Sequence, residues 1–359
     1  MKRFEKEREA MKWNLSNIWS NCGRTLGMAM LLVPFVWPAN ASAEELNIYS
    51  HRQAFLINPF LEAFTAKTGI KTNVVFASKG LAQRLQREGK NSPADVVLTV
   101  DIARLSVYAE KGLFANIDSD ILNSTIPSHL RDIDGHWFGL SLRSRIIGVS
   151  KERVQHGEIS SYEELADPKW RGRVCSRPGS HVYNRALVAS MIATHGEAKA
   201  EAWARGVVAN FARRPQGNDR AQAKAIFQGE CDVAIMNHYY YGKMLKSDKQ
   251  AQRDWANAIN IVFANQGADD RGAHINISGG GVTLHSKNKA NATKLLEFLV
   301  SDEAQMLYGK INYEYPVNPA TPIAPELKLW GDFKKDSLPI SRLAELAPQA
   351  QMIIDRVGW

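Results

Sequence analysis

The chain has 359 residues with a formal net charge of +8, and 45% of its residues are hydrophobic. This length exceeds what one small core needs and favours two lobes, while the ordinary apolar content is typical of a globular protein. Basic residues are spread along the chain rather than clustered, which argues against a binding groove for nucleic acid.

The first 43 residues have the pattern of an export signal. Arg24 precedes an apolar run over 26–37, and Ala41-Ser42-Ala43 offers small residues for cleavage. The run is too short to span a bilayer as a helix, but it fits the hydrophobic part of a secretory signal. We expect cleavage after Ala43. Because residues 1–43 contain six basic and three acidic side chains, the formal charge then falls from +8 to +5.

Residues 46–112 alternate between strand and helix patterns. The hydrophobic pattern predicts strands over 46–50, 71–76 and 94–100, and helices over 58–68, 79–88 and 101–111. Strands that alternate with helices predict a mostly parallel sheet, with ligands bound at the carboxyl ends of its strands.

Two extended stretches, 137–150 and 274–284, are predicted to cross between the lobes. The second contains Gly279-Gly280-Gly281, which indicates either close approach of backbones or a hinge. The remaining elements are predicted as strands 173–176, 231–236 and 259–264, and helices 183–195, 198–213, 219–228 and 289–307. We therefore predict an α/β protein of two lobes, each a mostly parallel sheet flanked by helices. Lobe 1 comprises 44–143 and 275–325, and lobe 2 comprises 144–274 and 326–359.

Three consecutive tyrosines, residues 239–241, follow the predicted strand 231–236 at the point where we expect strand to give way to loop. Tyr239 lies eight residues after Cys231, and Tyr183 lies eight residues after Cys175. In an oxidising compartment a disulfide between the two cysteines is the default expectation. If it joins neighbouring strands, it brings both tyrosine segments to one edge of the sheet.

Phenolate is a hard oxygen donor, which suits a hard trivalent cation such as Fe(III). We therefore predict Tyr183, Tyr239 and Tyr240 as metal ligands; the alternative is that the phenols only pack. A small anion such as carbonate, held by Arg52 and Arg104 at strand ends or by the helix start near Ser78, would complete the site. We interpret His51 either as a residue that supports the ligands by hydrogen bonding or as a fourth ligand.

Enzyme signatures are missing from the sequence. It contains no nucleophile elbow, phosphate loop, His-Glu-x-x-His or Cys-x-x-Cys motif, and its nine histidines are scattered. An iron-dependent oxygenase would need a pair of histidines near the tyrosines, and only His238 is close. The other alternative is the same fold binding an organic anion or a polyamine, with the tyrosines as an aromatic box.

Five stretches carry a resemblance to a known family: residues 47–53, 92–101, 167–172, 237–240 and 314–319. On these stretches the chain resembles the periplasmic ferric-iron-binding proteins of bacterial ABC transporters, which include the cyanobacterial iron-uptake proteins. The resemblance covers nearly all of residues 44–359. The motif Asn237-x-Tyr239-Tyr240 is its most specific part.

The resemblance implies a type II periplasmic binding protein, monomeric and not an enzyme, which passes Fe(III) to a permease and its ATPase subunit. It implies Tyr239 and Tyr240 as adjacent ligands and Tyr183 as the third, while Arg104 matches a basic residue near the family's iron. The His and Tyr that some members place after the first strand are replaced here by Gln53 and Ala54. Three tyrosines plus an exogenous anion or water are therefore expected to complete the site.

Overall fold

A computed structural model describes residues 45–359, so the predicted export signal lies outside the described part of the chain. Within residues 45–359, no helix combines the length and apolar character needed to cross a membrane. The described residues belong to one compact unit.

Eight strands form the sheet. They are β1 (Glu45–Ser50), β2 (Lys71–Phe76), β3 (Val96–Thr99), β4 (Phe138–Ser150), β5 (Val174–Cys175), β6 (Val233–Asn237), β7 (Ile259–Val262) and β8 (Ile275–Val282). Their order is β2-β1-β3-β8-β4-β6-β5, and β7 also pairs with β4.

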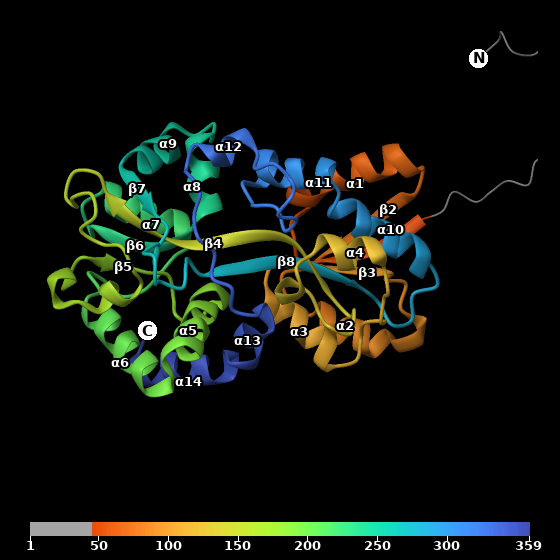
Figure 1. Ribbon diagram of the computed structural model, residues 1–359, viewed down its shortest axis with the longest axis horizontal. Helices are drawn as coiled ribbons and strands as arrows, with labels where there is room; N and C mark the ends of the chain where they lie inside the picture. The colour runs from red at the N-terminus through yellow and green to blue at the C-terminus, as the bar shows by residue number, and fades with distance from the viewer. Residues whose placement is uncertain (1–44) are drawn as a thin grey trace, which may run out of the picture. The chain divides into compact units, whose positions relative to one another are not determined.

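Fourteen α-helices flank the sheet in the described part of the chain (Figure 1). They are α1 (Ala54–Thr68), α2 (Leu81–Glu88), α3 (Ile102–Glu110), α4 (Asp120–Thr125), α5 (Val182–His195), α6 (Glu197–Ala209), α7 (Asp219–Phe227), α8 (His238–Leu245), α9 (Gln250–Asn257), α10 (Lys289–Leu299), α11 (Asp302–Leu307), α12 (Pro325–Lys328), α13 (Ile340–Glu345) and α14 (Ala347–Val357). Short 3-10 turns lie at η1 (Gly89–Asn91), η2 (Ser128–Leu130), η3 (Glu163–Ala166) and η4 (Pro168–Trp170), and one π-helix lies at η5 (Tyr308–Asn312).

The sheet is mixed, and its parallel pairs lie where the strand–helix alternation predicts them. β1 runs parallel to β2 and β3, and β5 runs parallel to β6. The two long strands β4 and β8 run antiparallel to each other and to their other neighbours, β3 on one side and β6 and β7 on the other. The expectation of a mostly parallel sheet therefore holds for β1, β2 and β3 and for β5 and β6, and not for β7 or the two predicted crossings.

The strands β4 and β8 lie side by side through the middle of the described unit (Figure 1). Both are buried along their whole length. The glycines of β8 are needed there because a Cβ on Gly281 would lie 2.6 Å from the carbonyl oxygen of His136, and one on Gly280 would lie 2.9 Å from that of Val97. Close approach of backbones, one of the two interpretations of this glycine run, is confirmed.

Helices cover the two halves of the sheet separately. α1 and α10 pack beside each other near β2 and β8, whereas α5, α6 and α14 pack together beside the β4–β6 half. Several predicted boundaries are wrong, including that of the predicted helix 198–213, which ends at Ala209. α1 begins at Ala54 rather than at residue 58, and the predicted helix 289–307 is two helices, because Ser301 caps α11 by accepting a hydrogen bond from the Ala304 amide. The tyrosine stretch is helical, as described below. The lobe boundaries stay a prediction.

Candidate metal centre

The three predicted ligand tyrosines all lie in the first turn of a helix. Tyr183 is the second residue of α5, and Tyr239 and Tyr240 are the second and third residues of α8. The loop predicted after residue 236 is wrong, because α8 begins directly where β6 ends. The amino end of a helix carries partial positive charge, which favours oxygen atoms that bear negative charge.

The phenols converge although the tyrosines are far apart in sequence. The Tyr239 hydroxyl donates a hydrogen bond to the Tyr183 hydroxyl oxygen at 3.1 Å, and the rings of Tyr239 and Tyr240 lie 4.6 Å apart between centroids. Behind them the predicted disulfide is present: Cys175 on β5 is bonded to Cys231, just before β6, with 5.9 Å between the Cα atoms. As the sequence predicted, β5 and β6 are neighbouring strands, the two cysteines are bonded, and the segments of Tyr183 and Tyr239 lie side by side.

Local packing explains why α8 holds this position. Gly242 is required because a Cβ there would lie 2.5 Å from the ring of Tyr313. His238 is fully buried: its Nδ1 accepts a hydrogen bond from the Ser144 amide at 3.0 Å, and its Nε2 donates to the Tyr313 carbonyl at 2.7 Å. Both ring nitrogens of His238 are therefore occupied. Tyr241 packs against Trp330, with 5.8 Å between ring centroids.

A cavity of about 210 Å³ opens in front of the three phenols. It is lined by residues from both halves of the sheet: His51, Arg52, Gln53, Phe55, Leu56, Val100, Arg143, Tyr183, Arg220, Tyr239, Tyr240, Lys243, Asn312 and Glu314. Of the predicted site residues, the three tyrosines, Arg52 and His51 line the cavity, whereas Arg104 does not. The helix start near Ser78 does not line it either, and α2 begins only at Leu81.

Arg52, Glu314 and Arg143 form a buried triad at the cavity wall. The carboxylate of Glu314 accepts from Arg52 Nη2 at 2.8 Å and from Arg143 Nη2 at 3.2 Å. Burial alone would raise the pKa of Glu314, but the two guanidinium groups outweigh it and hold that pKa at about 2. Arg52 Nη1 and Arg143 Nε are buried without a hydrogen-bond partner. The triad therefore carries one excess positive charge and unused donors.

A second triad lies behind Tyr183. Asp219, the first residue of α7, is fully buried and pairs with Arg145 at 2.7 Å and Arg177 at 3.0 Å. The Asp219 carboxylate also accepts from the backbone amide of Asn237 at 2.8 Å, and this contact holds the strand end that precedes Tyr239. This triad also carries one excess positive charge.

Each phenol ring has a guanidinium group close to its face. Arg143 lies 5.5 Å from the ring centroid of Tyr239, Arg177 lies 5.2 Å from that of Tyr183, and Arg220 lies 4.9 Å from that of Tyr240.

Burial raises the pKa of Tyr239 well above its usual range and raises that of Tyr240 to about 12, and the neighbouring Tyr183 adds to both effects. The phenols of Tyr239 and Tyr240 are therefore protonated at neutral pH, and a nearby cation would be needed to remove these protons.

His51 lines the cavity, and Arg104 is close enough to His51 to influence its charge. The Nε2 atom of His51 is 2.9 Å from the Tyr108 hydroxyl, and its Nδ1 atom is buried without a hydrogen-bond partner. Burial, with Arg104 nearby, lowers the pKa of His51 to about 4, so this side chain is neutral at physiological pH.

Several cavity residues were not singled out from the sequence, namely Arg143, Glu314, Arg220 and Lys243. Arg143 could have been found, because it and Arg145 are charged residues inside a strand whose other residues are apolar or small. Glu314 lies in one of the five family-like stretches but was given no role. The other two give no local signal, because they lie on the helices α7 and α8 like ordinary surface cations.

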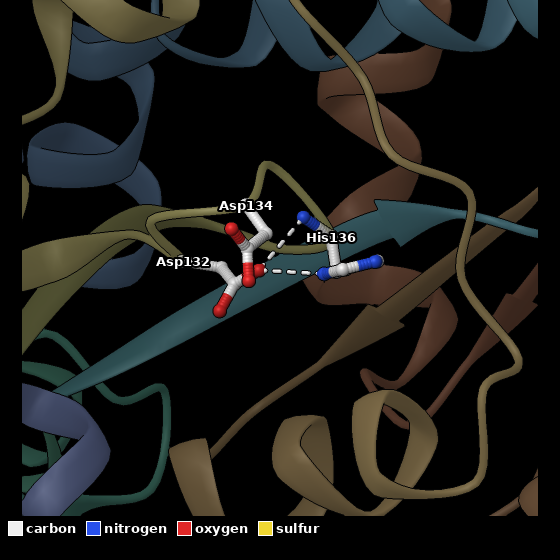
Figure 2. A group of neighbouring side chains, drawn as sticks. All are labelled: Asp132, Asp134 and His136. Atoms are coloured by element: carbon white, nitrogen blue, oxygen red, sulfur yellow. Dashed lines mark hydrogen bonds and ion pairs between the residues drawn. The ribbon is translucent and has the colours of Figure 1, made fainter.

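A second group of side chains offers metal-binding atoms. Figure 2 shows Asp132, Asp134 and His136, whose ligand atoms lie within 4.8 Å of one another in the turn before β4. Asp132 accepts hydrogen bonds from the backbone amide of His136 at 3.0 Å and from its Nδ1 at 2.8 Å. These hydrogen bonds close the turn between Asp132 and His136, which explains why the three side chains lie together. The group does not line the tyrosine cavity.

Comparison with known proteins identifies similar chains. The family model described as bacterial extracellular solute-binding protein matches residues 91–334. Iron uptake protein A1 of Synechocystis is 42% identical, over 96% of this chain and 94% of that protein.

Two solved structures are also similar. A Trichodesmium protein in complex with iron and citrate ligands is 44% identical with a TM-score of 0.84, over 88% of this chain and 99% of that one. Ferric iron-binding protein A of Mannheimia haemolytica, in an open conformation, is 45% identical with a TM-score of 0.82, over 88% of this chain and 99% of that one.

Proposed function

The chain belongs to the bacterial extracellular solute-binding protein family and has the type II periplasmic binding protein fold, and on this premise we propose that it captures Fe(III). The proposed ligands are the phenolate oxygens of Tyr183, Tyr239 and Tyr240. It acts without catalysis, as an exported carrier in the periplasm that passes iron to a permease and its ATPase subunit. The predicted cleavage after Ala43 is part of this proposal.

The convergence of the three phenols in one cavity is the observation that supports the proposal most. Three phenolates balance the charge of Fe(III), and hard oxygen donors suit this cation. Fe(III) supplies the positive charge that removes the protons which burial otherwise retains on Tyr239 and Tyr240. The name of the Synechocystis relative and the ligands of the Trichodesmium structure agree with this assignment.

An anion completes the proposed site. Arg52 and Arg143 have unused donors beside the cavity, and their triad has one excess positive charge. Charge-assisted hydrogen bonds from guanidinium groups suit carbonate or a carboxylate. Citrate is present with iron in the Trichodesmium structure, so a hydroxycarboxylate is a second candidate beside carbonate. Arg104 contributes to the local positive potential without lining the cavity.

The oxygenase alternative loses its main support, because both ring nitrogens of His238 are engaged in hydrogen bonds. The alternative of an aromatic box applies to an organic anion or a polyamine, and only the polyamine conflicts with the cations that line the cavity, Arg52, Arg143, Arg220 and Lys243. These groups repel a polyamine.

Ferric loading tests the proposal directly. Fe(III) bound by phenolate absorbs visible light by charge transfer, so the mature protein loaded with ferric salt and carbonate is expected to turn orange to red. The band should grow to a stoichiometry of one iron per chain and should not form with spermidine in place of iron. A colourless protein that retains no iron after gel filtration would refute the proposal.

A further inference from the structure

Phe55 and Lys243 meet across the cavity from opposite halves of the sheet. The ammonium of Lys243 lies 5.4 Å from the ring centroid of Phe55, and both residues line the cavity. Phe55 is on α1, which packs on β2 and α10, whereas Lys243 is on α8, which packs on β4, β6 and α7. The contact therefore connects two parts of the molecule that lie toward opposite ends of the long strands β4 and β8 (Figure 1).

Phe55 does not owe its position to core packing. The buried face of α1 consists of Ile57, Phe60, Leu61 and Phe64, while the side chain of Phe55 remains 64% exposed on another face.

The ammonium of Lys243 has no hydrogen bond or ion pair within residues 45–359, so the ring of Phe55 is its one close partner there. Burial lowers the pKa of Lys243 to about 8, while Glu314 favours and Arg52 and Arg220 oppose its charge. The ammonium remains the main form at neutral pH. A cation over an aromatic face is attracted by the ring's negative potential, and this attraction strengthens as water is excluded.

We propose that Phe55 and Lys243 form a latch across the cavity, which holds the two halves of the molecule closed over it and slows the release of its contents. The contact can form only when α1 and α8 approach each other, so it stabilises the closed arrangement selectively. This inference rests on the proposed function for its main readout, because the cargo is taken to be iron held by the tyrosines.

A double-mutant cycle tests the latch. Phe55→Leu keeps an apolar side chain without the ring, and Lys243→Met keeps the length without the charge. Protein loaded with Fe(III) and carbonate is mixed with excess EDTA, and the decay of the visible band gives the release rate. Each single variant should release iron about two- to five-fold faster, the change expected for one cation–π contact at a partly exposed site.

The double variant should be no faster than the faster single variant, because the contact is lost only once. Lys243→Arg should release iron more slowly than Lys243→Met, since a guanidinium also stacks on an aromatic ring. The latch would be overturned if the increase in release rate of the double variant equalled the product of the two single-variant increases. It would also be overturned if no variant released iron faster than the unsubstituted protein.

Lys67→Met is the matched control. Lys67 lies 5.9 Å from the ring centroid of Phe298, a similar contact formed by α1 and α10 within one half of the molecule. Its loss should leave the release rate unchanged.

All these variants keep the three tyrosines, so a missing iron band in the unsubstituted protein counts against the proposed function and not against the latch. In that case small-angle X-ray scattering of the iron-free protein decides. Phe55→Leu and Lys243→Met should increase the radius of gyration, and unchanged values would overturn the latch.

Discussion

The Tyr239 hydroxyl donates a hydrogen bond to the hydroxyl of Tyr183 at 3.1 Å across 56 positions of sequence, and the disulfide between Cys175 and Cys231 spans the same 56 positions. Each tyrosine lies the same distance after its cysteine, at the start of a helix that follows a strand. The disulfide thus holds in register the two segments whose phenols converge.

Replacing each tyrosine by phenylalanine should separate ligands from packing residues. Tyr183→Phe, Tyr239→Phe and Tyr240→Phe each remove one oxygen, so we expect loss or a strong shift of the visible band. Iron affinity should fall by more than the about 10–100-fold that loss of an outer-shell partner costs. Tyr241→Phe, which alters a ring packed on Trp330, should keep both band and affinity. Equal losses for all four variants would contradict the assignment.

Glu314→Gln should destabilise the fold, because it leaves Arg52 and Arg143 buried beside a neutral amide. Breaking a buried ion pair by removing one partner costs about 3–5 kcal/mol of unfolding free energy. The control is Glu303→Gln, which removes an exposed pair with Lys67 and should change stability by less than about 1 kcal/mol. Denaturant titration followed by circular dichroism measures both values, and a Glu314→Gln effect no larger than the control would be contrary to expectation.

Removing the disulfide should lower stability through the unfolded chain. Cys175 and Cys231 close a loop of 56 positions, for which loop-closure entropy gives roughly 4 kcal/mol in the oxidised protein. A Cys175→Ala/Cys231→Ala variant should therefore unfold at lower denaturant concentration. Iron affinity should fall less than in the Tyr239→Phe variant, because the phenols remain. Adding reductant to the double variant should have no further effect, whereas it should destabilise the unsubstituted protein.

The stability of the iron-free protein should decrease as pH falls below about 6.5. Burial lowers the pKa of His51 and His238 to about 4 and that of His181 and His274 to about 3, from an ordinary 6.5. Below pH 6.5 the unfolded chain binds protons that the folded protein does not, so the free energy of unfolding falls progressively toward pH 4.

Denaturant titrations at several pH values between 7.5 and 4.5 measure this loss. The expected slope is on the order of 1 kcal/mol per histidine per pH unit inside that window. His238→Gln should reduce the slope, whereas His285→Gln, at an exposed position, should leave it unchanged. A stability that stays constant or rises on acidification would contradict this explanation.

At α8 the local sequence pattern predicted a loop, whereas the structure has a helix. Three tyrosines and a glycine in succession are poor helix formers, and their propensity favours strand or loop. The helix forms because His238 is held by the backbone of Ser144 and Tyr313, and because Gly242 admits the ring of Tyr313. These contacts come from segments distant in sequence, and they override the local preference.

The sequence by itself determined the alternation of strands and helices, the cysteine pair and the three tyrosines at one sheet edge. These features follow from hydrophobic periodicity and from spacing along the chain, which are local quantities. Only the tertiary structure decided which charges surround the phenols. Arg143 and Glu314 meet across 171 positions, and Lys243 meets Phe55 from the other half of the molecule. The partner of a buried charge is chosen by long-range packing, and no short stretch of sequence carries that information.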